Sequence, residues 1–241
     1  MSPETLQAKD LNISIVIPAL NEENYIANCI NSLQGQIGSQ DELIVVDNGS
    51  TDKTARIAKE LGCTVVSEQK RGVSHARNRG AEVSSNPVLG FVDADGVVHN
   101  NWLQEAKRSL ADPRVSAVSG LNIFNHDSRL KEIWYNGYTV FAYAYVLILQ
   151  ACSKTFLVSN NLAIKKDVFD DIDRWKPIIG EDYWLSKEFW KRDTLHGAVN
   201  LRMRIDYSSR RFDQQGYLRT ISNWITQTLR RTSQEKYRQS R

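Results

Sequence analysis

The sequence predicts an α/β fold, in which a mostly parallel sheet is flanked by helices. Up to about residue 120, short apolar runs rich in β-branched residues alternate with segments of helical periodicity. The runs are apolar at successive positions, which is typical of parallel strands buried on both faces. The 241 residues are 41% hydrophobic and 24% charged, which suits a single domain spanning 1–241 with one large core.

The first two predicted strands are ISIVI at 13–17 and ELIVV at 42–46. A helical pattern at 22–34 lies between them. A second predicted helix at 50–61 begins with STD, a sequence that caps helices and places Asp52 in the first turn. The order strand, helix, strand, helix is that of a parallel sheet.

The alternation continues to residue 120. Strands are predicted for CTVVS at 63–67, VLGFV at 88–92 and VSAVSG at 115–120. Helices are predicted between them, at 73–84 with small residues on one face and at 102–110.

The second half of the chain breaks the alternation. We expect an aromatic helix at 127–152, a strand that enters a turn and short helix at 156–169, and an amphipathic helix at 180–192 that begins with acidic residues. A last helix at 217–231 has apolar residues at helical spacing and arginines off that stripe. This half therefore predicts a C-terminal helical region.

Polar segments follow three of the predicted strands, and such segments meet at one edge of a parallel sheet, where ligands bind. They are Pro18 to Glu22, Asp47 to Asp52, and Asp93 to Asp95. A fourth segment, RGVSHARNRG at 71–80, brings arginines toward these acids: Arg71, Arg77 and Arg79. Four polar segments at one edge indicate a binding site rather than four ordinary turns.

Two aspartates one residue apart, Asp93 and Asp95, end the fourth strand and leave three interpretations open. They hold a hard divalent cation, or Asp93 is the nucleophile of a phosphatase, or both cap a turn.

The charge is unevenly distributed. From Arg202 onward ten Lys or Arg stand against three Asp or Glu, a balance of +7, while the remainder carries 21 against 25, or −4. A basic end indicates an anionic partner, such as a phosphate group, a membrane surface or a nucleic acid, and the alternative is a solvated helix face. The three cysteines are scattered and the first residues do not resemble a signal peptide, so we expect reduced thiols and a cytoplasmic protein.

Several of these segments resemble the successive motifs of the family 2 glycosyltransferases, which have the GT-A fold. The similar segments are SIVIPALNEENYIANCINSL, ELIVVDNGSTDKT, RGVSHARNRGA, VLGFVDADG, NNLAIKKDVF and GEDYWLSKEF, between about Ile13 and Phe189. The resemblance implies a Rossmann-like nucleotide-binding half at about 10–120, an acceptor-binding half at about 121–215, and a basic amphipathic helix at about 216–241. It also implies inverting, metal-dependent transfer of a sugar, of hexosyltransferase type, from a nucleoside diphosphate to a hydroxyl group.

The resemblance further implies roles for individual residues. Pro18, Ala19, Asn21, Glu22 and Asp47 would line the nucleotide pocket, Arg77 would brace it, and Asp93 would lie near the ribose and the metal. Asp95 would ligate Mn²⁺ or Mg²⁺, Asp182 would be the catalytic base, and Glu181, Asn160 and Asn161 would lie on the acceptor side. Arg210 and Arg211 are candidates for binding the diphosphate, or are simply exposed. The Gln-x-x-Arg-Trp sequence of processive members does not follow GEDYWL, which favours a single transfer.

The expected partners are a UDP-sugar donor and a hydroxyl acceptor, which could be linked to a lipid or be a cell-surface glycan precursor; no nucleic acid is expected. The uncharged stretch 133–153 is long enough to cross a membrane. One crossing there would separate Asp93 from Asp182, so we interpret 130–152 as an aromatic helix near the acceptor site. Together with the predicted helix at 217–231, this aromatic helix favours peripheral attachment of the protein to the inner face of an anionic membrane. The alternative is that both helices pack on their own domain.

Other function classes fit less of the sequence. A haloacid-dehalogenase-like phosphatase would use FVDADGVV, with Asp93 as nucleophile, but leaves PALNEE and VDNGSTD without a role. This sequence lacks the Gly-rich first loop that a nucleotidyltransferase would have after the first strand. A non-catalytic nucleotide-binding protein is the remaining alternative.

Overall fold

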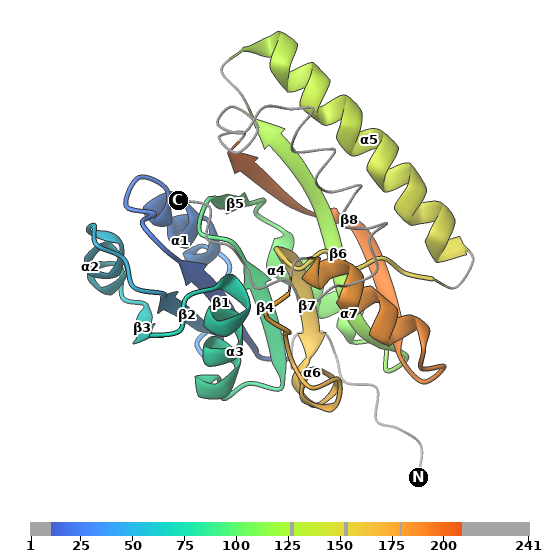
Figure 1. The fold of residues 1–241 in the computed structure, drawn as a ribbon, viewed down its shortest axis with the longest axis horizontal. Helices are drawn as coiled ribbons and strands as arrows, with labels where there is room; N and C mark the ends of the chain where they lie inside the picture. The colour runs from blue at the N-terminus through green and yellow to red at the C-terminus, as the bar shows by residue number, and fades with distance from the viewer. Residues whose placement is uncertain (1–10, 126–127, 152–153, 179, 209–241) are drawn as a thin grey trace.

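The computed structural model describes residues 11–125, 128–151, 154–178 and 180–208 (Figure 1). In this part of the chain the strands form one eight-stranded sheet in the order β3-β2-β1-β4-β7-β6-β8-β5. The strands are β1 (Ile13–Ala19), β2 (Glu42–Asp47), β3 (Thr64–Ser67), β4 (Val88–Val92), β5 (Gly96–Val98), β6 (Val115–Asn125), β7 (Asn161–Lys165) and β8 (His196–Ser208).

Most of these strands run in one direction. Neighbouring pairs are parallel from β3 to β4 and again between β6 and β8. The antiparallel pairs all involve β7 or β5, so these two described strands oppose the other six. The predicted α/β sheet, mostly parallel, is confirmed.

Helices cover both faces of the sheet (Figure 1). One layer holds α1 (Ile26–Gln34), α2 (Thr54–Glu60) and α4 (Trp102–Leu110), which pack on Ile13, Ile15 and Ile17. The other holds α3 (Val73–Val83), α6 (Lys166–Asp171) and α7 (Glu181–Trp190), whose buried apolar residues form one cluster with Val16, Ile44 and Val46. Successive residues of β1 thus enter opposite layers, and all seven are buried.

Helix α5 (Arg129–Ala151) lies apart from these layers, beside β6 and β8 (Figure 1). It corresponds to the aromatic helix predicted at 127–152. None of the described helices combines the length and the apolar composition needed to span a bilayer.

Two strands were not predicted, β5 and β8. β8 carries Arg202, Arg204 and Asp206 among its apolar residues and is only partly buried, so its apolar pattern is weak. It is a strand because it pairs along β6 on one side and with β5 on the other.

Helices α1 and α2 each begin four residues later than predicted, at Ile26 and Thr54. The amide groups of Glu22 and Glu23 donate to the side chains of Thr54 and Asp52, at 2.7 and 3.1 Å. Glu22 and Glu23 therefore belong to a loop before α1, and this loop is bonded to the loop before α2 and to the first residue of α2.

A satisfied polar cluster fills the centre of the sheet around Asn161, whose side chain is fully buried. Its Oδ1 accepts from Trp102 Nε1 at 2.8 Å, and its Nδ2 donates to Asn122 Oδ1 at 3.0 Å and to the Met203 carbonyl at 3.2 Å. Gly120 lies against this cluster. A Cβ atom there would be 1.8 Å from the Met203 carbonyl oxygen and 2.6 Å from the Asn161 amide.

We predict that Gly120→Ala lowers the free energy of unfolding by about 1–3 kcal/mol, because backbone atoms of β8 would have to move. Chemical denaturation measures the change. Gly137→Ala is the matched control, since a Cβ atom there meets nothing within 4 Å and alanine favours a helix. Equal stability of the two variants would contradict the packing described for β6 and β8.

Candidate active site

The loops after β1 and β2 are joined by reciprocal hydrogen bonds. The Asn21 amide donates to Ser50 Oγ at 3.0 Å, and Asn21 Oδ1 accepts from the Thr51 amide at 2.8 Å. Asn21 holds a left-handed backbone with φ of 56°, a conformation that asparagine tolerates. The two predicted nucleotide-binding loops therefore form one continuous rim at the carboxyl edge of the sheet.

Pro18 and Ala19 are the last residues of β1, and their side chains are buried. The Ala19 carbonyl accepts from the Asn48 amide at 2.9 Å, so the end of β1 also helps to position the loop after β2. Glu22 is half-buried beside them, at the start of the loop to α1.

Asp47 ends β2, where its Oδ1 accepts from the Ser50 amide at 3.0 Å. The next residue, Asn48, fixes the loop after β3 by donating to the carbonyls of Glu68 and Lys70 and accepting from the Gly72 amide. This loop places the Arg71 guanidinium about 3.5 Å from where a Cβ atom of Gly49 would be. An exposed cation thus lies next to Gly49, in the loop that follows Asp47.

Asp93 follows β4 directly, and its side chain is about one quarter exposed. Its Oδ1 accepts from Arg77 Nη2 at 2.8 Å, while its carbonyl accepts from Cys29 Sγ at 3.6 Å. Burial, with the charges of Asp95 and Asp93 added, raises the pKa of Cys29 well above its usual value, so Cys29 is a neutral thiol beneath the two aspartates. Asp95 is half-buried two residues on.

Arg77 connects this aspartate pair to α7. Its side chain is buried, its Nη1 lies 3.4 Å from Glu181 Oε1, and the guanidinium lies 5.4 Å from the ring centre of Trp175. Burial alone would lower the pKa of Arg77, but Asp93 and Glu181 outweigh it and raise the pKa. Arg77 was predicted to brace the nucleotide pocket; it lies beneath the site, between two carboxylates. Arg79, in contrast, pairs with Glu82 at 3.3 Å.

Asp182 is the second residue of α7, after Gly180 in a left-handed conformation with φ of 83°. Its Oδ1 accepts from the Ser159 amide at 2.7 Å. Burial and the neighbouring charge of Glu181 raise the pKa of Asp182 to about 6, against the opposing effects of Ser159 and Arg77. The backbone dipole at a helix start ordinarily stabilises a carboxylate as an anion, which predicts a lowered pKa for Asp182. The shift is in the other direction, because desolvation and Glu181 outweigh the backbone dipole, yet Asp182 stays mostly ionised at neutral pH.

The residues predicted on the acceptor side divide. Asn160 is half-buried at the sheet edge, where its Oδ1 accepts from Asn122 Nδ2 at 3.0 Å. Asn161 is enclosed in the core cluster, so its side chain supports the sheet and has no surface to offer an acceptor. The structure thus places Asn161 in the core rather than on the predicted acceptor side, because Asn161 is the first residue of β7, whose residues are buried in succession, whereas Asn160 lies in the turn before that strand.

The sequence did not single out Ser159, Tyr143 or Trp175. The Ser159 amide holds Asp182, and Tyr143 on α5 donates to the Gly120 carbonyl at 2.5 Å and accepts from the Asn122 amide at 3.0 Å. A tyrosine among several on one helix carries no motif, so only the fold could identify it.

Two carboxylates at the end of a strand suit a hard divalent cation. Asp93 accepts from Arg77 through Oδ1, and Asp95 lies half-buried two residues further on, at the same end of β4. The described residues contain no group of three or more His, Cys, Asp or Glu arranged around one point. A cation held here would complete its coordination with substrate phosphates and water, as Mg²⁺ commonly does. The residues fit a metal bound together with a substrate.

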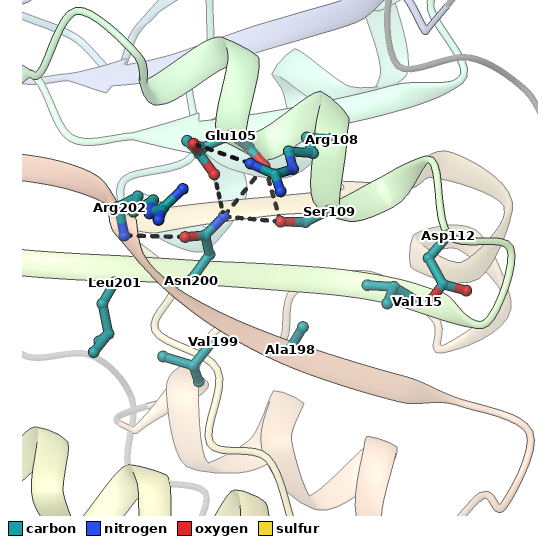
Figure 2. A pocket seen from close by; sticks show the side chains of 10 residues that line it. All are labelled: Glu105, Arg108, Ser109, Asp112, Val115, Ala198, Val199, Asn200, Leu201 and Arg202. Carbon is teal, nitrogen blue, oxygen red and sulfur yellow. Dashed lines mark hydrogen bonds and ion pairs between the residues drawn. The ribbon is translucent and has the colours of Figure 1, made fainter.

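A separate hollow of about 590 Å³ lies between α4 and β8 (Figure 2). Its polar groups already bond to one another: Asn200 Nδ2 donates to Glu105 Oε2 at 2.9 Å and to Ser109 Oγ at 3.0 Å. None of the predicted site residues lines it. Arg210, Arg211 and the helix predicted at 217–231 lie outside the described residues.

Known proteins with similar sequences are glycosyltransferases. The sequence profile described as Glycosyl transferase family 2 matches residues 14–173. Glycosyltransferase AglE of Haloferax volcanii is 29% identical over 173 residues, which cover 66% of this chain and 54% of AglE. The 4,4'-diaponeurosporenoate glycosyltransferase of Staphylococcus aureus is 40% identical over 101 residues, 37% of this chain and 27% of that protein. The chain thus spans about half or less of the length of these relatives.

Two solved structures share the fold. The mannosyltransferase PcManGT from Pyrobaculum calidifontis, in complex with GDP-Man and Mn²⁺, matches with a TM-score of 0.65 and 19% identity over 88% of this chain and 64% of that chain. Glucosyl-3-phosphoglycerate synthase from Mycobacterium tuberculosis, in complex with Mn²⁺, UDP and phosphoglyceric acid, matches with a TM-score of 0.64 and 23% identity over 92% and 80%.

The raised pKa of Asp182 predicts a pH-dependent stability difference. Below a pH of about 4, the ordinary pKa of an aspartate, Asp182 is protonated in both the folded and the unfolded state. Because the folded state binds this proton more tightly, the proton stabilises the folded state, and this stabilisation is lost as the pH rises through about 6. Asp182→Asn has no such proton. Its free energy of unfolding relative to wild type should therefore rise by about 1 kcal/mol between pH 5 and pH 7.

Urea denaturation at both pH values measures this difference. Asp112→Asn is the control, because Arg114 lowers the pKa of Asp112 to about 2 and both states are ionised throughout that range. A flat profile for Asp182→Asn would mean that Asp182 ionises as an ordinary carboxylate.

Proposed function

This chain belongs to family 2 of the glycosyl transferases and has the GT-A fold, and from this premise we propose that it moves one sugar from a nucleoside diphosphate sugar to a hydroxyl acceptor with inversion at the anomeric carbon. One observation carries the proposal. Arg77 contacts both Asp93, at the end of β4, and Glu181, beside Asp182 at the start of α7. A donor-side and an acceptor-side carboxylate group are thereby held at one edge of the sheet.

The rim of the β1 and β2 loops supports a nucleotide on the donor side. We propose that Asp47 accepts a hydrogen bond from the nucleoside, with Asn21 and Glu22 beside it and the backbone of Pro18 and Ala19 below. Arg71, exposed next to Gly49, is available to the diphosphate. Arg210 and Arg211 remain proposed for the same anion on sequence grounds alone.

Asp95 and Asp93 would hold the divalent cation, Mn²⁺ or Mg²⁺. When bound, such a cation supplies positive charge that neutralises the leaving nucleoside diphosphate. Arg77 supports this role from below, because it fixes one oxygen of Asp93 and leaves the other free to turn to the metal.

Asp182 is the proposed base. Its Oδ1 is held by the Ser159 amide, which orients the second oxygen toward the acceptor hydroxyl as it attacks the anomeric carbon. A carboxylate with a pKa of about 6 is both ionised at neutral pH and more basic than an ordinary aspartate. Glu181 and Asn160 are proposed to orient the acceptor or a hydroxyl of the donor sugar.

We further propose that the donor is a UDP-hexose, that the acceptor is linked to a lipid, and that the protein attaches peripherally to the cytoplasmic face of an anionic membrane. The solved structures contain GDP-Man in one case and UDP in the other, and the acceptors named for relatives range from phosphoglyceric acid to 4,4'-diaponeurosporenoate. The balance of +7 from Arg202 onward supports the anionic surface. The phosphatase alternative is set aside, because the chain belongs to another family and Asp93 is already paired with Arg77.

Donor binding should require the cation and Asp95. We expect a thermal shift with a UDP-sugar in Mn²⁺ that exceeds those with GDP-, dTDP- and CMP-sugars and disappears in EDTA, because bound ligand stabilises the folded state by mass action. Asp95→Ala should lose this shift, whereas Asp193→Ala, which removes an exposed carboxylate before β8, should keep it. The proposal fails if wild type binds the donor equally in Mn²⁺ and in EDTA.

Removing the base should separate binding from chemistry. We predict that Asp182→Asn keeps the Mn²⁺-dependent donor affinity but loses about 10²–10⁴-fold in transfer rate, measured as release of the nucleoside diphosphate with water or an acceptor panel. Glu188→Gln is the matched control, since Glu188 lies on the same helix and pairs with Lys191 at 2.6 Å. Normal turnover by Asp182→Asn would show that Asp182 is not the base and only occupies the first turn of α7.

A further inference from the structure

Helix α5 is attached to the sheet by polar side chains. Asn136 Oδ1 accepts from the Phe124 amide and its Nδ2 donates to the Phe124 carbonyl, both at 3.0 Å. Tyr143, two turns further on, bonds to the backbone of Gly120 and Asn122. Thr139 lies between them and is buried. The side of α5 that faces the protein is therefore attached by hydrogen-bonding side chains, with Val146 as a buried apolar residue beside them.

The opposite side of α5 is apolar and exposed. Trp134, Phe141 and Ile148 follow one another at seven-residue intervals, and 69%, 79% and 63% of each is accessible. Leu130, Val140 and Tyr145 extend this surface, which we term the outer face of α5. A surface helix of a protein in water has the reverse pattern, with its apolar stripe toward the core. An exposed apolar area of this kind marks a place where another apolar phase is met.

The charges around the outer face of α5 indicate what kind of apolar surface this face contacts. From Ile133 to Ala151 there is no charged residue, while Arg129 and Lys131 precede the stretch and Lys154 follows it. The acid of α5, Glu132, is half-buried, on the side toward the protein. Aromatic and aliphatic side chains bracketed by cations match the boundary between headgroups and acyl chains of an anionic bilayer.

We propose that the outer face of α5 docks the protein on an anionic lipid bilayer, with the helix lying in the plane of the interface. The occupant is lipid rather than protein because cations flank the face at both ends and the rings of Trp134, Phe141 and Tyr145 lie outward along it.

The docked helix would also orient the candidate active site. Tyr143 bonds to Asn122, Asn122 bonds to Asn160, and the amide of the neighbouring Ser159 holds Asp182. This chain of contacts links α5 to the acceptor side. On the basis of the proposed function, the acceptor hydroxyl is then one carried by a molecule embedded in the same lipid surface, which approaches Asp182 beneath α5.

Vesicle flotation tests the docking. Wild type should bind vesicles of phosphatidylcholine and phosphatidylglycerol at a ratio of 7:3 more strongly than phosphatidylcholine alone, and Phe141→Asp with Ile148→Asp should lower binding to the anionic vesicles at least tenfold. The control pair, Val83→Asp with Leu201→Asp, makes the same chemical change at two exposed apolar residues off α5 and should bind as wild type. Brominated lipid should quench Trp134, judged against Trp134→Phe.

Three results would overturn the proposal: vesicle binding by the α5 pair equal to wild type, a wild-type dimer that the α5 pair converts to monomer in sedimentation, or photocrosslinking from position 141 to the 217–231 segment in the presence of vesicles. Mn²⁺-dependent UDP-sugar binding is measured on every variant. If the control pair loses vesicle binding as much as the α5 pair does, and both keep donor binding, the docking proposal is refuted and the proposed function is not. If wild type binds vesicles but does not bind the donor, the proposed function is refuted and the docking is not.

Discussion

The geometry of the candidate site depends on one buried guanidinium. Arg77 comes from α3 and lies between Asp93, at the end of a strand, and Glu181, at the start of a helix 104 residues along the chain. Arg77 is the cation that faces these acids, and its charge also lowers the pKa of Asp182 against the effects of burial and of Glu181. Two carboxylates and the ring of Trp175 offset the cost of burying the arginine, and removal of both carboxylates would leave its charge buried and uncompensated.

The sequence predicted the first half of the fold well because its signals are local. The strands at 13–17, 42–46 and 88–92 are continuous apolar runs, and each is buried on both faces in the sheet. The helix starts were misplaced because the amides of Glu22 and Glu23 bond to side chains about thirty residues away, which no local pattern contains. β8 was missed because its partners, β5 and β6, define it more than its own residues do.

The candidate site shows the same division between local and non-local information. The motif residues were located by their sequence, but their working states were not. The pKa of Asp182 moves upward because of its burial and of Glu181. Asn161 is enclosed because its side chain bonds to residues 39 to 59 positions away in the chain. The aromatic stretch at 127–152 was predicted as a helix, while its polar attachment to β6 and its apolar outward side required the coordinates of both elements.

The reciprocal bonds between the loops after β1 and β2 have a consequence for how a ligand would be received. Asn21 and Ser50, Glu22 and Thr54, and Glu23 and Asp52 bond across the gap, so each loop uses the other to satisfy its amides. Such a rim is preorganised: it holds its shape before any nucleotide arrives, and little conformational entropy is lost on association. A ligand bound at this rim would therefore be selected by its fit to a shape that is fixed in advance.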